Sequence, residues 1–308
     1  MPEGNFAAQG VSHVNGFYRH IAACNPPIDE VFVPWRIDDQ VVGWLRPGFV
    51  EELARFPEVF DIRAEELRFA GSLQLAETRS AALDQVARDL ATQDVIPPYQ
   101  GEPFAVTPGE REAALCVVDR AAAAPFGVRS FGQHLNGFVR RPDGIHMWLG
   151  RRARDRLLFP GALDNMVAGG LPYSLSLEAN LVKECEEEAG VPAALARKAV
   201  PVGVVSYSRA APRGLRRDVL YCYDLELPDD FVPQNTDGEV EEFLLLPLSE
   251  VAAIVRETDE FKLNCNLVVI DFLIRHGWLA PHSPDYLRLV LGLRRSLDAV
   301  DNSLIVVG

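Results

Sequence analysis

The stretch of sequence that decides the fold is GGLPYSLSLEANLVKECEEEAGV, residues 169–191. A glycine pair opens it, and its second half carries apolar residues at the spacing of an amphipathic helix: Leu177, Leu181, Val182 and Cys185. The hydroxyl of Ser176 suits a helix N-cap, and Gly190 suits the left-handed residue that often follows a helix. The pattern therefore predicts a loop after the glycine pair and then a helix over residues 177–189.

Four glutamates crowd the end of this predicted helix. The carbonyl pole of a helix disfavours carboxylates, and neighbouring like charges repel one another, so the placement costs stability unless something compensates it. Glu184, Glu187 and Glu188 stand at positions i, i+3 and i+4 and project from one face, whereas Glu186 points elsewhere. Mg²⁺ and Mn²⁺ prefer oxygen ligands and would neutralise the cluster. These three glutamates are our candidate metal ligands, and we expect Glu187 to be catalytic as well.

The stretch resembles the Nudix box, whose pattern is G-x5-E-x7-R-E-U-x-E-E-x-G-U with U an aliphatic residue. Gly169 stands at its first glycine, and the three candidate ligands stand at its last three glutamates. Leu175 replaces its first glutamate and Lys183 its arginine, which puts the geometry of the loop in question more than metal binding. The resemblance implies an α/β/α sandwich with a mixed sheet. It also implies hydrolysis of a diphosphate, with Mg²⁺ or Mn²⁺ as the cofactor.

The resemblance extends beyond the box to most of residues 10–290. It is carried by PGALDNMVAGG (160–170), FKLNCNLVVIDFLIRHG (261–277), HIAACNPP (20–27) and FVPWRIDDQVVGWLRP (32–47). These segments look like a Nudix subfamily related to thiamine pyrophosphokinase, including the extra N-terminal domain found there. That resemblance implies thiamine diphosphate, or its oxidised and damaged forms, as the substrate and the monophosphate as the product. The alternatives are hydrolysis of ADP-ribose or another nucleoside diphosphate derivative, isomerisation of a prenyl diphosphate, and a Nudix-fold binding module without turnover.

Two blocks of sequence differ in their organisation. The first block reads as mixed strands and helices, with strand patterns at residues 31–37 and 41–45 and helical spacing at 50–56 and 79–92. A segment rich in proline and glycine follows at residues 94–110. We therefore predict an accessory α+β domain over residues 1–108 and a Nudix domain over residues 109–308 that ends in a helical extension. The fold class is α/β or α+β.

Downstream residues would complete a diphosphate site. Glu239 is our candidate general base, and Glu241 and Glu242 compete with it for that role. Arginine forks suit phosphate oxygens, and two arginine-rich runs flank predicted strands. The residues that we assign to substrate binding are Arg209, Arg213, Arg217 and Arg152, together with the glycine pair Gly169 and Gly170. A basic hairpin tip that stays solvated explains the first three arginines equally well.

The amino-acid composition limits the classes of partner that we expect for this protein. The 308 residues carry 44 acidic and 30 basic side chains, and the net charge of −14 disfavours nucleic acid and anionic membranes. Five scattered cysteines without a C-x-x-C pair argue against a disulfide framework and a thiolate zinc site. The first residues show no targeting or membrane-spanning pattern. We predict a cytoplasmic protein whose partner is a small-molecule diphosphate, and an accessory domain that shapes the substrate pocket or a homodimer contact.

Overall fold

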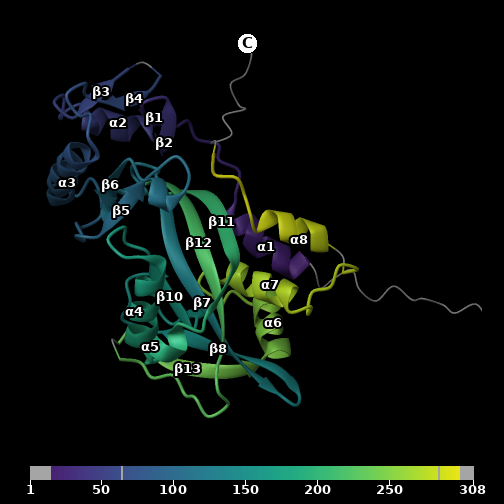
Figure 1. Cartoon of the computed structure of the whole chain (residues 1–308). Coiled ribbons are helices and arrows are strands. Elements are labelled where there is room, and N and C mark those ends of the chain that lie inside the picture. Colours follow the sequence, from purple (N-terminus) through teal and green to yellow (C-terminus); the bar gives the residue numbers. More distant parts are fainter. Residues whose placement is uncertain (1–14, 64, 237, 284, 299–308) are drawn as a thin grey trace, which may run out of the picture.

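The computed structural model describes residues 15–63, 65–236, 238–283 and 285–298. These residues form an N-terminal unit on a four-stranded sheet and a larger unit on a seven-stranded sheet (Figure 1). A short two-stranded sheet lies between the two in the sequence. No helix among the described residues has the length and the apolar character that crossing a bilayer requires.

The N-terminal unit has a mixed sheet with strand order β2-β1-β4-β3. Its elements are β1 (Val33–Ile37), β2 (Gln40–Leu45), α2 (Pro47–Leu53), β3 (Phe60–Ile62), β4 (Leu67–Phe69) and α3 (Ala76–Thr92). β1 pairs in parallel with β4 and antiparallel with β2, to which a tight turn at Asp38 with a φ of +53° connects it. Trp35 is fully buried in the core of this unit, so this tryptophan packs the interior.

The core of the N-terminal unit continues through the next pair of strands. These elements are β5 (Pro103–Val106), the 3₁₀ turn η1 (Arg111–Ala113), β6 (Cys116–Asp119) and the 3₁₀ turn η2 (Arg120–Ala122). Phe104, Phe126 and Val128 pack in the same hydrophobic core as Trp35. The division at residue 108 stays a prediction about independently folding domains, but N-terminal packing continues past it to the start of the larger sheet.

The larger unit is built on a mixed sheet with strand order β11-β12-β7-β8-β13. These strands are β7 (Arg129–Arg141), β8 (Gly144–Arg152), β11 (Val200–Ala211), β12 (Gly214–Glu226) and β13 (Val240–Pro247). β7 and β12 run parallel, and the other neighbours pair antiparallel. Two short strands, β9 (Leu163–Asn165) and β10 (Val167–Gly170), pair with β8 and β7. β10 therefore leads the chain from the sheet directly into the glycine-containing loop.

Helices cover both faces of this sheet (Figure 1). One face packs against α4 (Leu177–Ala189) and the short α5 (Ala193–Ala196), around a core that includes Leu135 and Tyr223. The other face packs against α6 (Leu248–Glu257) and α7 (Cys265–Arg275), with α8 (Tyr286–Gly292) beside them. The α/β/α sandwich with a mixed sheet, preceded by a smaller α+β unit, is thus confirmed.

The first described helix, α1 (Asn15–Cys24), belongs to the larger unit rather than to the N-terminal one. Its residues Phe17, Ile21 and Cys24 are buried in the core that α6, α7 and α8 form. In Figure 1, α1 (purple) accordingly lies beside α8 (yellow), although the two are at opposite ends of the chain. A deletion from the N-terminus that includes α1 would therefore also remove one helix of this layer of the sandwich.

Candidate active site

The predicted helix is α4, and the structure places it at Leu177–Ala189. The Oγ atom of Ser176 accepts a hydrogen bond from the backbone N–H of Ala179 at 3.1 Å, and Gly190 follows the helix with a φ of +61°. The helix buries one side against the sheet through Leu181, Cys185 and Ala189. Both end signals and the helical span are therefore as predicted. Of the three candidate ligands on this helix, Glu187 is exposed, Glu184 is partly exposed and Glu188 is buried.

Gly169 lies against Glu184 at the end of β10. A Cβ atom on Gly169 would stand 2.6 Å from Cδ and 2.7 Å from Oε2 of Glu184. A Cβ atom at this position would overlap the Glu184 side chain and force its carboxylate to move, so the lack of a side chain at Gly169 lets the carboxylate lie against β10. Gly170 differs, because its Cβ would meet the end of the flexible Arg120 side chain at 3.3 Å. Of the glycine pair that we assigned to substrate binding, Gly169 makes room for a candidate metal ligand.

Lys183 joins two of the candidate ligands. Its Nζ atom lies 2.6 Å from Oε2 of Glu187 and 3.4 Å from Oε1 of Glu184. These contacts raise the pKa of Lys183. Burial raises the pKa of Glu184, and repulsion from Glu187 and Glu239 adds to this rise while Lys183 opposes it. The site therefore holds more negative charge than one ammonium group balances.

Glu188 is the most enclosed of the three glutamates. The residue is 9% exposed, and its Oε2 atom accepts a hydrogen bond from the backbone N–H of Ala168 at 2.9 Å. Burial raises the pKa of Glu188 to about 8, and the charges of Asp164 and Glu184 raise it further. A carboxylate enclosed in this way is costly to ionise unless a cation compensates its charge. Its environment suits a metal ligand.

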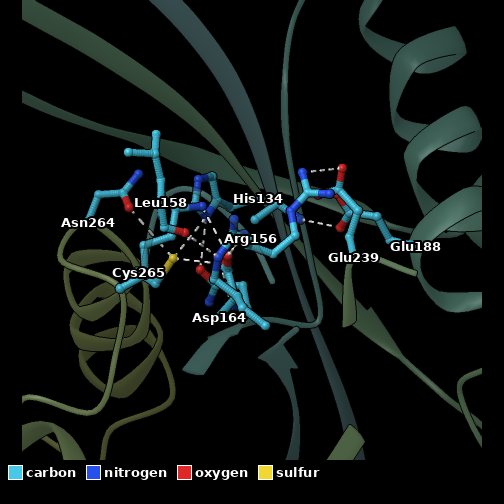
Figure 2. Close-up of polar contacts among 12 residues, drawn as sticks. His134, Arg156, Leu158, Asp164, Glu188, Glu239, Asn264 and Cys265 are labelled. Carbon is cyan, nitrogen blue, oxygen red and sulfur yellow. Dashed lines mark hydrogen bonds and ion pairs between the residues drawn. The ribbon is translucent and has the colours of Figure 1, made fainter. Parts of the chain in front are cut away.

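Glu239 reaches this cluster from the loop before β13. Its charge contributes to the raised pKa of Glu184. Its Oε1 atom accepts a hydrogen bond from Nη2 of Arg156 at 2.7 Å (Figure 2). Its backbone carbonyl accepts a second one from the N–H of Ala153 at 2.9 Å, so the loops that follow β8 and precede β13 hold each other.

The two competing glutamates have partners of their own. Glu241 lies 3.4 Å from Nε of Arg154, and Glu242 accepts a hydrogen bond from Nε of Arg151 at 2.8 Å. Glu239 is thus the member of this acidic run whose charge acts on a candidate metal ligand. This favours Glu239 among the three, and its role as the base stays a prediction.

Two of the arginines predicted to bind phosphate have partners outside α4. Arg217 is only 2% exposed and donates to the backbone carbonyls of Gly127 and Leu297. These contacts give Arg217 a structural role and leave little of it free for a ligand, and its assignment to substrate binding stays an untested prediction. Arg213 lies 3.1 Å from Asp94 of the N-terminal unit. Its assignment stays a prediction.

The remaining two assigned arginines lie on different parts of the sheet. Arg209 is close enough to Cys24 of α1 to oppose the rise in thiol pKa that burial causes. Arg152 lies 3.2 Å from Asp164, whose charge in turn acts on Glu188. Of the four, Arg152 is therefore the one that the structure links to the candidate metal site, through a carboxylate.

A buried cluster that the sequence did not single out lies near these residues (Figure 2). Ligand-type atoms of His134, Asp164 and Cys265 lie within 4.8 Å of one another. Asp164 also lies 3.0 Å from Lys262 and 3.2 Å from Arg152. Burial lowers the pKa of His134 to about 4 and raises that of Cys265, so ring and thiol are neutral. Two cations already balance Asp164, which makes this a structural network rather than a metal centre.

No local pattern could have revealed this network. Its members come from β7, β9 and α7, which are far apart in the sequence, and single His, Asp and Cys residues carry no spacing signal. The tertiary fold alone brings them together.

Comparisons with known proteins show the family of this chain. A family model described as the NUDIX domain matches residues 133–265, and one described as a domain of unknown function, DUF4743, matches residues 16–130. Nudix hydrolase 20, chloroplastic, of Arabidopsis thaliana is 42% identical over 294 residues, which cover 92% of this chain and 79% of that protein. The chain belongs to the Nudix hydrolase family. It is an enzyme that acts on pyrophosphate bonds.

Two further relatives are similar to this Nudix hydrolase over most of its length. Nudix hydrolase 24, chloroplastic, of Arabidopsis thaliana is 41% identical over 297 residues, which cover 94% of this chain and 80% of that protein. An uncharacterized protein of Saccharomyces cerevisiae is 34% identical over 262 residues, which cover 79% of this chain and 75% of that protein. The word chloroplastic describes the plant proteins, and a cytoplasmic location stays our prediction for this chain.

Solved structures similar to this Nudix hydrolase include a MutT protein from Methanosarcina mazei Go1. That protein is 15% identical, with a TM-score of 0.36 over 48% of this chain and 95% of the other. An Ap4A hydrolase from C. elegans is 13% identical, with a TM-score of 0.36 over 49% of this chain and 99% of the other.

Proposed function

We propose that this Nudix hydrolase cleaves a diphosphate linkage at α4, where Glu184, Glu187 and Glu188 hold Mg²⁺ or Mn²⁺. The observation that carries the proposal is the concentration of charge around Glu184, which lies against Gly169 and is repelled by neighbouring carboxylates. Surface charges on a helix spread apart where they can, whereas here β10 confines one carboxylate and burial confines another. Such a cluster suits a cation ligand set.

The donor set fits a hard divalent cation. All three candidate ligands offer carboxylate oxygens, and the raised pKa of Glu188 shows that its charged form lacks full compensation from the protein. A cation bound there would bridge the carboxylates to a negatively charged diphosphate and make a bound water more acidic. The cofactor is therefore part of the proposal, with Mg²⁺ first and Mn²⁺ as the alternative.

Protein groups around the ligands would orient the attacking water and accept its proton. We propose that Glu239 accepts the proton of the attacking water, because it faces the cluster from a separate loop and Arg156 holds its carboxylate in place. Glu187, exposed on the same helix face, is the second catalytic carboxylate of the proposal. Lys183 limits the repulsion between Glu184 and Glu187.

The proposed substrate is thiamine diphosphate or an oxidised or damaged analogue. The support for this identity is the resemblance of the N-terminal and C-terminal segments to a thiamine-related Nudix subfamily. An exposed apolar run also suits an organic group: Leu157, Leu158 and Phe159 are 95%, 61% and 45% exposed and follow Arg156, the partner of Glu239, in the sequence. Exposed apolar runs of this kind commonly mark binding surfaces.

One contact bears on the rate of this hydrolase. The ammonium of Lys183 already bridges two of the carboxylates that a metal would use. If this pairing persists when ligand is present, the metal would bind weakly and turnover would be slow.

A substrate panel tests the proposal. Phosphorus NMR would follow thiamine diphosphate, its oxidised analogues, ADP-ribose and nucleotide sugars with Mg²⁺, with Mn²⁺ and with excess chelator. We expect selective, metal-dependent release of the thiamine monophosphates. Turnover of ADP-ribose instead would change the substrate, and metal-independent turnover would refute the metal site. Thermal stabilisation by one of these compounds without any turnover would contradict its proposed role as substrate, since a ligand that binds only the native state raises the melting temperature whether or not it is cleaved.

A further inference from the structure

We infer that Arg111, in the N-terminal unit, is a positioning residue for the metal site, because it holds the loop between β10 and α4 by its backbone. The inference rests on the proposed function, since it concerns how the proposed ligand Glu184 is placed. It gives the N-terminal unit a task in catalysis that does not require contact with the substrate.

Arg111 contacts this loop through two carbonyl groups. Its Nη2 atom donates to the carbonyl of Pro172 at 2.7 Å and to that of Leu175 at 2.5 Å. Its guanidinium also lies 5.4 Å from the ring centroid of Tyr173. The residue is 4% exposed, so water competes little for these hydrogen bonds. One buried cation thus joins both ends of the turn that precedes α4.

The same strand pair supplies a further anchor. Arg111 lies in η1, between β5 and β6, and the backbone N–H of Tyr173 donates to the carbonyl of Pro103 at the start of β5 at 2.6 Å. On its other side the loop is held by β7, where the N–H of Leu171 donates to the carbonyl of Phe131 at 3.0 Å. The loop is therefore fixed between the N-terminal unit and the larger sheet.

The position of this loop sets the position of Glu184. The loop ends at Ser176, which caps α4, and it follows β10, whose Gly169 lies against the Glu184 carboxylate. The end of the Glu184 side chain lies directly against the backbone of Gly169, so the strand forms one wall of the space that the carboxylate occupies. A shift of the loop would move the start of the helix relative to the glycine and so displace the carboxylate.

Arginine suits this role better than other residues. Its planar fork presents several N–H groups in fixed directions, so that one nitrogen can serve two carbonyls while another reaches Glu112 at 3.0 Å. The contact is to the carbonyl of Leu175, so it does not depend on the side chain at that position. The Nε atom of Arg111 is buried without a hydrogen-bond partner. The geometry that makes the loop contacts therefore leaves one N–H donor of the guanidinium unsatisfied, which costs stability.

The test compares Arg111→Met with Arg79→Met in the full-length chain. Arg79 is a matched control, because it is also buried in the N-terminal unit and donates to a backbone carbonyl, that of Leu73 at 3.1 Å, away from the loop. Mn²⁺ binding, followed by electron paramagnetic resonance, is the readout that does not require turnover. We expect Arg111→Met to weaken Mn²⁺ binding up to about 10-fold, the lower end of the effect of losing a direct outer-shell partner, because Arg111 acts on the ligand only through the loop. Arg79→Met should leave it unchanged.

Two further measurements keep the inference open to refutation. Amide hydrogen exchange should accelerate in residues 171–176 of Arg111→Met and not of Arg79→Met, and Arg111→Lys should fall between Arg111→Met and wild type in both readouts. If Arg111→Met does not fold, the lysine variant decides. Equal exchange and equal Mn²⁺ affinity in the Arg111 variants and wild type would overturn the inference. If wild type itself binds no Mn²⁺, the proposed function fails instead, and loop exchange alone decides whether Arg111 holds the loop.

Discussion

Two charge-rich regions of this chain look alike in the sequence and differ in the structure. Residues 184–188 carry four glutamates, and residues 209–217 carry four arginines. In the first region the charges act on one another around Glu184, whereas in the second Arg213, Arg216 and Arg217 have separate partners: Asp94, Asp218 and the carbonyl of Gly127. A high density of charged residues therefore indicates a common site only where the helix or strand that carries them points their side chains in one direction.

The physical reason is the direction of side chains. Positions i, i+3 and i+4 of a helix share one face, but neighbouring residues of a strand point to opposite faces. Arg216 and Arg217 are adjacent in β12, so Arg216 pairs with Asp218 at 3.1 Å while Arg217 donates to Gly127 on the other side. Arg209 lies opposite Arg216 in the register of the hairpin. The arginines could not all have faced one phosphate group.

The largest effect is expected for Glu187→Gln, compared with Glu186→Gln. Both residues are exposed on α4, but only Glu187 belongs to the proposed ligand set. Losing one charged ligand and catalytic carboxylate should lower metal-dependent kcat by roughly 10³-fold. The Glu186 variant should retain wild-type kinetics, and both should keep the wild-type melting temperature. Equal losses in the two variants would show that the helix face does not matter.

Metal binding should depend strongly on pH because of Glu188. Burial raises its pKa to about 8, so its carboxyl group is neutral below that pH in the metal-free protein and must lose a proton to bind a cation. Mn²⁺ affinity should therefore rise by up to about tenfold per pH unit between pH 6 and 8 and then level off. The stability of the metal-free protein should change with pH in the opposite direction. A raised carboxyl pKa stabilises the folded protein at low pH, and this stabilisation is lost as the pH rises towards 8.

Isothermal titration at pH 6, 7 and 8, with melting curves of the metal-free protein at the same pH values, measures both trends. An affinity that is flat over this range would mean that Glu188 does not take part in metal binding.

A smaller loss is expected for Gly169→Ala, which places a methyl group against Glu184. The clash at 2.6 Å should displace the carboxylate and lower kcat about tenfold or more with little change in KM. Gly170→Ala is the contrast, because its methyl group meets a flexible arginine side chain that can move. Steady-state kinetics of the two variants would show whether the space at Gly169 is needed. Wild-type kinetics in Gly169→Ala would contradict the close approach of β10 and α4.

The smallest effect is expected for Arg213→Ala in the hairpin. Arg213 is exposed and pairs with Asp94, and such surface pairs contribute about 0–1 kcal/mol to stability. Its removal should change kcat/KM by less than about twofold on the substrate identified by the panel. A tenfold rise in KM would show that the hairpin contacts the substrate. The arginines of residues 209–217 would then form a site as the glutamates of residues 184–188 are proposed to do.

Local sequence patterns predicted the part of the site that is contiguous in the chain. The span of α4, the Ser176 cap and the left-handed Gly190 all follow from short-range rules. The spacing also placed Gly169 at the start of the loop. These features need no knowledge of the rest of the molecule.

Features that depend on contacts between distant segments could not be predicted in this way. Arg111 meets the loop only after the β5–β6 strand pair folds onto the larger unit, and α1 joins helices from the other end of the chain. Asp164 and its cationic partners are likewise assembled by the tertiary fold. None of these residues has a neighbour in the sequence that indicates its role.

The most direct test of the metal site is an anomalous diffraction map from crystals of the full chain soaked with Mn²⁺. We predict a peak within ligand distance of Glu184, Glu187 and Glu188, together with release of Lys183 from at least one of the two carboxylates that it contacts. A peak at His134, Asp164 and Cys265, or no peak along α4 in crystals of an active preparation, would contradict the account.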